Sequence, residues 1–511
     1  MPTTDRRPGF WLVLLVSWGL LTVLSSLWAL ATPVGAAPDE PAHLIKAASV
    51  VRGQYIGGPS SQGSIVQVPL YIAYTQAETC YAFAPDQSAA CIPTVPGDPA
   101  LVVDATTTAG LYNPLYYAIV GWPSLILGDN KGIFAMRAVG AIATSLFLAL
   151  AFALISRWRR AVIPIVGFAA AVTPMVLFLA GTVNPNSVEV AATLAAFVGM
   201  LTLVRAEPTR LWLPSTVVTV SAVVAANMRG LSLLWLALAL LSPFMIVGRA
   251  RFFALLKARP IQIAIFVTAG AVIAAAVWLL STNSLGAAID DPTTPSTAPG
   301  TGTSPLLGFA WTLFASFDYS QGIVGIFGWL DTPAPVFVFF VWALLAGGLL
   351  LLALVFLRGR ALVLVLALTS ALLLLPPILQ GIYIERGGII WQGRYILPVF
   401  VCAVLGASTL LADRIDLRRR DATALLVIVS GLWALAQFQS FATSLRRYAV
   451  GYHDGWLDLL SPEWTPPGGI FPSLIAFGLV GAIAGLFLVV VVRRWAPLES
   501  ADVATERLSS R

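Results

Sequence analysis

The stretch Pro38-Asp39-Glu40-Pro41-Ala42-His43-Leu44-Ile45-Lys46 follows an apolar run that extends from Phe10 to Ala31. About 20 consecutive apolar residues are enough for a helix to cross the hydrocarbon core of a bilayer, so the run predicts a first membrane-spanning helix. Two adjacent carboxylates, an imidazole and an ammonium then follow where that helix would leave the membrane. Similar apolar runs recur to the end of the chain, and we expect an all-α, polytopic helical membrane protein.

The composition excludes an ordinary soluble protein. Of the 511 residues, 58% are hydrophobic and 11% are charged, and the mean hydropathy is +0.86, whereas globular proteins carry about 25% charged residues. The net charge of +6 is distributed as membrane topology requires, and we expect no nucleic-acid partner. The excess of Arg over Lys, with many Ala and Val residues, indicates a bacterial genome that is rich in GC.

Apolar segments of spanning length predict twelve transmembrane helices. The segment 112–127 is left out, because its prolines, short length and aromatic residues fit a helix that lies in the membrane interface. With this segment outside, the clusters of basic residues fall in cytoplasmic loops, as the positive-inside rule requires. We therefore expect a multi-pass protein of the bacterial plasma membrane with both termini in the cytoplasm. The predicted spans lie near residues 10–32, 132–155, 161–182, 185–204, 211–226, 230–248, 260–281, 334–357, 361–381, 394–412, 422–442 and 471–492.

The polar parts of this single transmembrane domain, residues 1–495, are expected to lie mainly on the outer face. The first apolar run resembles a signal peptide but is too long for one, so we expect it to be retained. The large first extracytoplasmic loop, 33–131, is long enough to form a folded cap with interfacial helices. Residues 282–333 form a second large outer loop, and residues 496–511 a disordered cytoplasmic tail.

Cys80 and Cys91 both lie in the first outer loop. An exported loop is in an oxidising environment, which favours a disulfide between them. Two unpaired thiols are the alternative.

Asp39 and Glu40 are the first candidates for chemistry. Pro41 is well placed as the first residue of a helix, and the helix macrodipole stabilises a carboxylate just before it. On such a helix His43 and Lys46 are three residues apart and face the same way. Two interpretations stay open: a helix cap with solvated basic side chains, or a site where these four groups converge at the membrane surface.

Further polar residues lie at the outer ends of later spans. Glu189 is about one turn inside a predicted span, where an ionisable side chain is costly and tends to be functional or paired. Asn186, just before it, either caps that helix or joins the site. Arg394, next to Tyr395, either holds a phosphate with its bidentate guanidinium group or reaches toward lipid headgroups.

Arg137 and Arg229 also lie near outer ends of predicted spans. For Arg229 we expect contact with lipid headgroups. The sequence contains no metal-ligand spacing, phosphate-binding glycine loop or nucleophile elbow.

Together, these stretches resemble the GT-C superfamily of membrane glycosyltransferases, over roughly residues 10–412. The acidic pair in Pro-Asp-Glu-Pro-Ala-His is similar to the catalytic first outer loop of that superfamily. Tyr112-Asn113-Pro114-Leu115-Tyr116-Tyr117 resembles its juxtamembrane helix, and Gly393-Arg394-Tyr395 with Pro398 resembles its Arg-Tyr-x-x-Pro motif. Ala135-Met136-Arg137, Asn184-Pro185-Asn186 and Gly328-Trp329-Leu330-Asp331 complete an order of motifs that is similar to an uncharacterised bacterial branch of membrane proteins.

The resemblance implies an inverting sugar transfer on the outer face of the membrane. The donor would be a polyprenyl-phosphate-linked sugar, the acceptor an envelope glycan or lipid, and membrane lipids would surround both. By position, Asp39 is the expected catalytic base, with Glu40 beside it. The residues expected to bind substrate are His43, Lys46, Arg137, Asn186, Glu189, Arg394 and Tyr395.

Two questions stay open at this point. Many members of the superfamily have Asp where this chain has Asn186, with Glu189 one turn on as a substitute, so the use of a divalent metal is undecided. A transporter or flippase for lipid-linked saccharides, or a non-catalytic envelope scaffold, is the alternative function. Transporters tend to place ionisable residues near the middle of the membrane, whereas the predicted spans here are nearly free of charge at their centres, which favours the enzyme.

Overall fold

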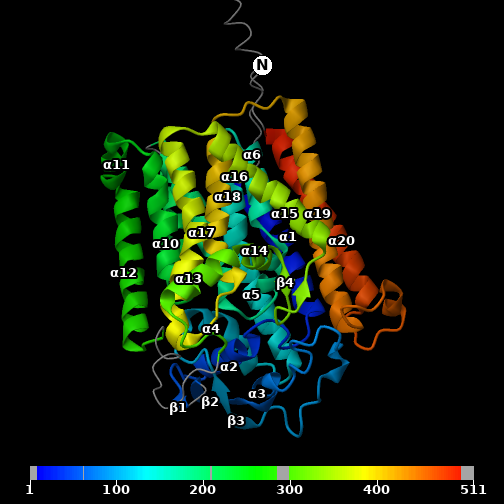
Figure 1. The fold of residues 1–511 in the computed structure, drawn as a ribbon. Helices are drawn as coiled ribbons and strands as arrows, with labels where there is room; N and C mark the ends of the chain where they lie inside the picture. Colours follow the sequence, from blue (N-terminus) through cyan, green and yellow to red (C-terminus); the bar gives the residue numbers. More distant parts are fainter. Residues whose placement is uncertain (1–8, 61–62, 208–209, 285–297, 496–511) are drawn as a thin grey trace, which may run out of the picture.

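A computed structural model describes residues 9–60, 63–207, 210–284 and 298–495. Figure 1 shows long helices that run side by side, with a smaller part containing strands at one end of the bundle. We call this part, residues 32–129 between α1 and α5, the cap. The predicted tail, 496–511, lies outside the described residues.

The bundle is built from apolar helices of very different burial. In the span Gly393–Leu411, 94% of the 18-residue apolar segment is buried, whereas 11% of the corresponding segment of α12 is buried. Helix α18 is therefore central in the bundle and α12 is peripheral. A π-helical turn, Ala343–Gly347, joins α15 to α16, and a 3-10 turn, η7 (Gly393–Ile396), leads into α18. The helices are α1 (Phe10–Ala31), α5 (Asn130–Ile155), α6 (Val162–Ala171), α7 (Pro174–Ala180), α8 (Pro185–Arg205), α9 (Trp212–Ala226), α10 (Ser232–Leu241), α11 (Arg249–Leu256), α12 (Arg259–Ser281), α13 (Pro305–Phe314), α14 (Ser316–Val324), α15 (Val336–Trp342), α16 (Gly348–Phe356), α17 (Gly359–Gly387), α18 (Leu397–Leu411), α19 (Arg419–Ala449) and α20 (Ile470–Trp495).

Within the described residues, nine helices are long and apolar enough to cross a membrane, or ten if the bent pair α6–α7 is one span. The pair bends by 60° where Pro174 has no N–H to continue the helix and Thr173 caps α7 through its side chain. The predicted spans 211–226 and 230–248 coincide with α9 and α10, which are shorter apolar helices. All twelve predicted segments are helical, while the number of twelve spans stays a prediction.

The cap contains a three-stranded antiparallel sheet in the order β1-β2-β3, so the expectation of an all-α chain is wrong here. In β2, Val66 and Val68 are buried while Ile65 and Gln67 are exposed, the period of two that a half-buried strand requires. Helix α2 packs over β2 and β3. The strands are β1 (Gly58–Ser60), β2 (Gly63–Pro69) and β3 (Val102–Thr107), and the helices are α2 (Glu40–Val50), α3 (Leu70–Ala73) and α4 (Pro114–Gly121).

Two further segments position the site. The apolar stretch 112–127 forms α4 and a 3-10 turn, Trp122–Leu125, and α4 packs against α2 in the cap. The segment 282–333, predicted as a loop, contains α13, which packs along α17, then α14 and a hairpin of β4 (Ile326–Phe327) and β5 (Thr332–Pro333).

Candidate active site

The segment from Thr32 to Pro38 joins α1 to α2 without regular structure, yet every one of its carbonyl groups accepts a hydrogen bond. Backbone carbonyls shielded from water need such partners, and most of these come from distant parts of the chain. The donors are Arg137 to Thr32 and Pro33, Tyr81 to Val34, Trp329 to Gly35, Tyr448 to Ala36, the backbone of Glu40 to Ala37, and Arg394 and Asn184 to Pro38. The whole fold therefore sets the backbone that leads into Asp39.

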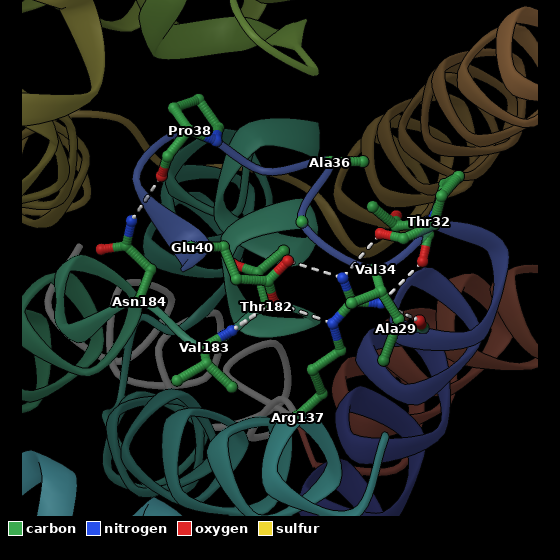
Figure 2. A network of polar contacts seen from close by, with 12 residues as sticks. Ala29, Thr32, Val34, Ala36, Pro38, Glu40, Arg137, Thr182, Val183 and Asn184 are labelled. Atoms are coloured by element: carbon green, nitrogen blue, oxygen red, sulfur yellow. Dashed lines mark hydrogen bonds and ion pairs between the residues drawn. The ribbon is translucent and has the colours of Figure 1, made fainter. Parts of the chain in front are cut away.

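Glu40 and Arg137 form a fully buried ion pair beneath this segment (Figure 2). Nε and Nη2 of Arg137 donate to Oε1 and Oε2 of Glu40 at 2.8 and 2.6 Å. The other guanidinium N–H groups donate to three carbonyls at and just after the end of α1, so all five donors are used. Glu40 Oε1 also accepts from the backbone N–H of Val183 at 2.9 Å. The pair ties together α1, α2, α5 and the turn before α8. Both side chains are fully enclosed, and the catalytic role expected for Glu40 and the substrate-binding role expected for Arg137 stay predictions.

Asp39 differs from its neighbour, because its side chain is 47% exposed. Its backbone has φ +65°, in the left-handed region that Asp enters more readily than most residues. In this conformation its carboxylate makes no hydrogen bond to the first N–H groups of α2, so it is not a side-chain helix cap. Instead Oδ2 accepts from Nη2 of Arg394 at 2.5 Å. The structure thus pairs the exposed carboxylate of Asp39, which lies between α1 and α2, with the buried guanidinium group of Arg394, which precedes α18.

The surroundings of Asp39 keep it ionised and keep His43 neutral. Packing around the Asp39 carboxyl raises its pKa, but the positive charges of Arg394 and Arg229 lower it, and the net result is a pKa below the ordinary value. Burial lowers the pKa of His43 to about 3, and Nδ1 of this ring lies 2.9 Å from the Tyr117 hydroxyl oxygen. At neutral pH the negative charge therefore resides on Asp39, beside an uncharged imidazole.

Arg229 also belongs to this cluster, while the headgroup contact expected for it stays a prediction. Its guanidinium carbon lies 4.6 Å from the centre of the Tyr395 ring, and the guanidinium carbon of Arg394 lies 5.3 Å from the same ring centre. No ion pair engages Arg229 in the part of the chain that the structure describes, and the side chain is only partly buried. Tyr112, Glu189 and Asp39 lie near enough to act on its charge, but none of them forms a salt bridge with it.

The remaining predicted residues are enclosed. Lys46 is buried and donates to two backbone carbonyls of the cap at 2.5 Å each. Asn186 donates to Glu189 Oε2 at 2.9 Å, and Ser232 donates to Oε1 of the same carboxyl at 2.6 Å. Lys46, Asn186 and Glu189 are each 0–1% exposed. The site that the structure assembles is therefore Asp39, His43, Arg229, Arg394 and Tyr395.

These residues do not fit a metal centre. Divalent ions of the hard type prefer several carboxylate oxygens, whereas Asp39 is paired with Arg394, and Glu189 accepts hydrogen bonds from neutral groups. Among the described residues, no group of three His, Cys, Asp or Glu side chains is arranged to hold a metal ion.

The bundle, the cap and this charged cluster define a multi-span membrane protein with a candidate active site where the cap meets the helix ends. The chain belongs to the family described as "Predicted membrane protein (DUF2142)", whose model matches residues 22–403, a range that includes Asp39, Arg229 and Arg394. This assignment confirms the expected branch of membrane proteins.

Among solved structures, the chain is similar to ArnT from Cupriavidus metallidurans in the apo state. The TM-score is 0.46 and the identity 12%, with 95% of this chain and 77% of that chain covered. At these values the likeness assigns no activity. No curated protein sequence matches the chain significantly.

Proposed function

We propose that this protein is a glycosyltransferase of the bacterial plasma membrane that uses a polyprenyl-phosphate-linked sugar to build an envelope glycan or glycolipid. The proposal rests on the placement of Asp39 at the end of the bundle that the cap covers. Its exposed carboxylate pairs with the guanidinium group of Arg394 and lies near the positive charge of Arg229. In this proposal the capped end is the outer one. A donor whose lipid tail lies in the bilayer presents its phosphate at that level, so no soluble nucleotide site is needed.

In the proposed reaction, the acceptor hydroxyl oxygen attacks the anomeric carbon of the sugar while Asp39 takes the hydroxyl proton. The bond from that carbon to the phosphate oxygen breaks, and attack from the opposite face inverts the anomeric configuration. Arg229 and Arg394 stabilise the negative charge that develops on the leaving phosphate. Because Arg394 also pairs with Asp39, the arriving phosphate weakens that pair and raises the proton affinity of the base.

Arg229→Gln is expected to raise the KM for the lipid-linked donor by about tenfold to a hundredfold, since a hydrogen bond to a charged group contributes about 1.5–3 kcal/mol. The measurement is initial rate against donor concentration in proteoliposomes. Arg446→Gln is the matched control, because Arg446 also lies 4.6 Å over an aromatic ring, Trp456, and is partly buried. Similar KM values for both variants and the wild type would exclude Arg229 from donor binding.

The pH dependence of kcat/KM is expected to report Asp39, because this parameter follows the free enzyme. The active form is the ionised one and its pKa is lowered, so activity should fall only below about pH 4, the ordinary value for Asp. Arg394→Gln removes the charge that lowers the pKa of Asp39 most and leaves the burial that raises it. The acidic limb of the pH profile should therefore move to higher pH. An acidic limb at the same pH in both proteins would show that Asp39 is not the titrating base.

The proposed function itself is tested by reconstituting the purified protein with a panel of polyprenyl-phosphate sugars and detecting released polyprenyl phosphate by mass spectrometry. Release that requires an acceptor supports a glycosyltransferase. Net movement of the lipid across the bilayer without sugar transfer would identify a transporter or flippase instead. Neither activity with any donor of the panel would favour the scaffold.

A further inference from the structure

Three aromatic side chains outside α1 and α2 hold the backbone that precedes Asp39. Tyr81 Oη, Trp329 Nε1 and Tyr448 Oη donate in turn to the carbonyls of residues 34–36, at 2.5, 3.0 and 3.2 Å. Tyr81 comes from the cap, Trp329 from the turn between β4 and β5, and Tyr448 from the end of α19. None of the three belongs to the site described above.

Arg447 connects the elements that carry these aromatic residues. Its side chain is fully buried and donates to three carbonyls, of Tyr81, Ala84 and Gln87, which all lie within the loop that the disulfide Cys80–Cys91 closes. Nη2 also donates to Oδ2 of Asp331 in the β4–β5 turn, at 3.1 Å. The guanidinium carbon lies 4.7 Å from the centre of the Tyr448 ring.

The β4–β5 turn is shaped closely around these partners. Gly328 has φ +62°, and a Cβ atom there would lie 2.3 Å from Oδ1 of Asp331 and 2.9 Å from the Tyr448 hydroxyl. Leu330, at the tip of the turn, lines a small cavity together with Pro38 and Arg394. The turn therefore packs against Tyr448 and shares a cavity with Arg394, the residue that pairs with Asp39.

We infer that Tyr81, Trp329 and Tyr448 form a clamp that sets the backbone of Asp39, with Arg447 and the disulfide-closed loop holding the clamp in place. A left-handed backbone is uncommon for residues other than glycine, although less so for aspartate, and it persists where the surrounding structure fixes it. The clamp residues are positioning residues, since they act on Asp39 through residues 34–38. The inference rests on the proposed function, in which Asp39 is the base.

Tyr448→Phe tests the clamp, because it removes one hydroxyl and leaves the ring. Amide hydrogen exchange across residues 33–43 should become about tenfold faster, as expected for the loss of one buried hydrogen bond, and kcat should fall with little change in KM. Tyr71→Phe is the matched control: Tyr71 is also fully buried in the cap and its hydroxyl donates to a carbonyl, that of Leu127, at 2.9 Å. This control should leave exchange across 33–43 as in the wild type.

Reduction of Cys80–Cys91 in the purified wild type is the second test, and it should also speed exchange across 33–43. Unchanged exchange there in both Tyr448→Phe and the reduced protein would overturn the clamp. Faster exchange in a protein that shows no sugar transfer would support the clamp and contradict the proposed function, so the two failures are distinguishable.

Discussion

Asp39→Asn is expected to lower kcat for sugar transfer by roughly 10²–10⁴-fold, the usual contribution of a general base, and to leave the fold intact. An amide cannot take the proton of the acceptor hydroxyl. Asparagine enters the left-handed backbone region as readily as aspartate, and its carbonyl oxygen can still accept from Arg394. The measurement is single-turnover release of polyprenyl phosphate from the donor.

Asp86→Asn is the control for this substitution. Asp86 is another aspartate of the cap that faces a basic group, with Oδ1 2.6 Å from Nδ1 of His453. Both of these side chains are exposed to solvent, unlike Arg394. Its turnover should stay within about twofold of the wild type, since exposed pairs contribute little. Wild-type turnover in Asp39→Asn would remove Asp39 from the role of base.

Glu40→Gln is expected to destabilise the protein by about 3–5 kcal/mol, because it leaves the buried charge of Arg137 without its partner. The melting temperature in detergent should fall by about 5 °C or more, while folded protein retains turnover. This result would show that Glu40 and Asp39 have different roles, although the two carboxylates are adjacent in the sequence.

Asp416→Asn makes the same chemical change in an exposed ion pair, with Arg160 at 2.9 Å, and should shift the melting temperature far less. Loss of turnover in Glu40→Gln without any loss of stability would contradict the structural role and return Glu40 to the chemistry.

The sequence predicted the helical segments and the grouping of Asp39 with Arg394 in one site, but not how the individual side chains of that site are placed. Apolar length alone located the helices, and the polar ends of spans brought Asp39 and Arg394 into one proposed site, although 355 residues separate them. Adjacent carboxylates suggested a shared role for Asp39 and Glu40. Next to the left-handed backbone at Asp39, the Asp39 side chain instead lies in the exposed site and the Glu40 side chain lies in the interior. No residue pattern in the sequence predicts that backbone conformation.

Arg229 and the cap sheet show where the sequence was insufficient. Helix α9 has 15 residues, which corresponds to about 22 Å at 1.5 Å per residue and is shorter than the hydrocarbon core of about 30 Å. The turn after α9 places Arg229 over the Tyr395 ring within the protein. The strands of the cap are only three to seven residues long, too short for their alternation to outweigh the helical pattern of the rest.

We expect Asp39, Arg394 and Arg229 to surround one lipid-linked donor, and the decisive experiment is a structure of Asp39→Asn with a bound polyprenyl-phosphate sugar. The donor phosphate should lie within hydrogen-bonding distance, about 3 Å, of the Arg229 and Arg394 guanidinium groups. The anomeric carbon should face position 39 across a space that admits an acceptor hydroxyl. A donor phosphate bound elsewhere, with Arg394 still paired to position 39 and Arg229 without contact, would contradict the claim.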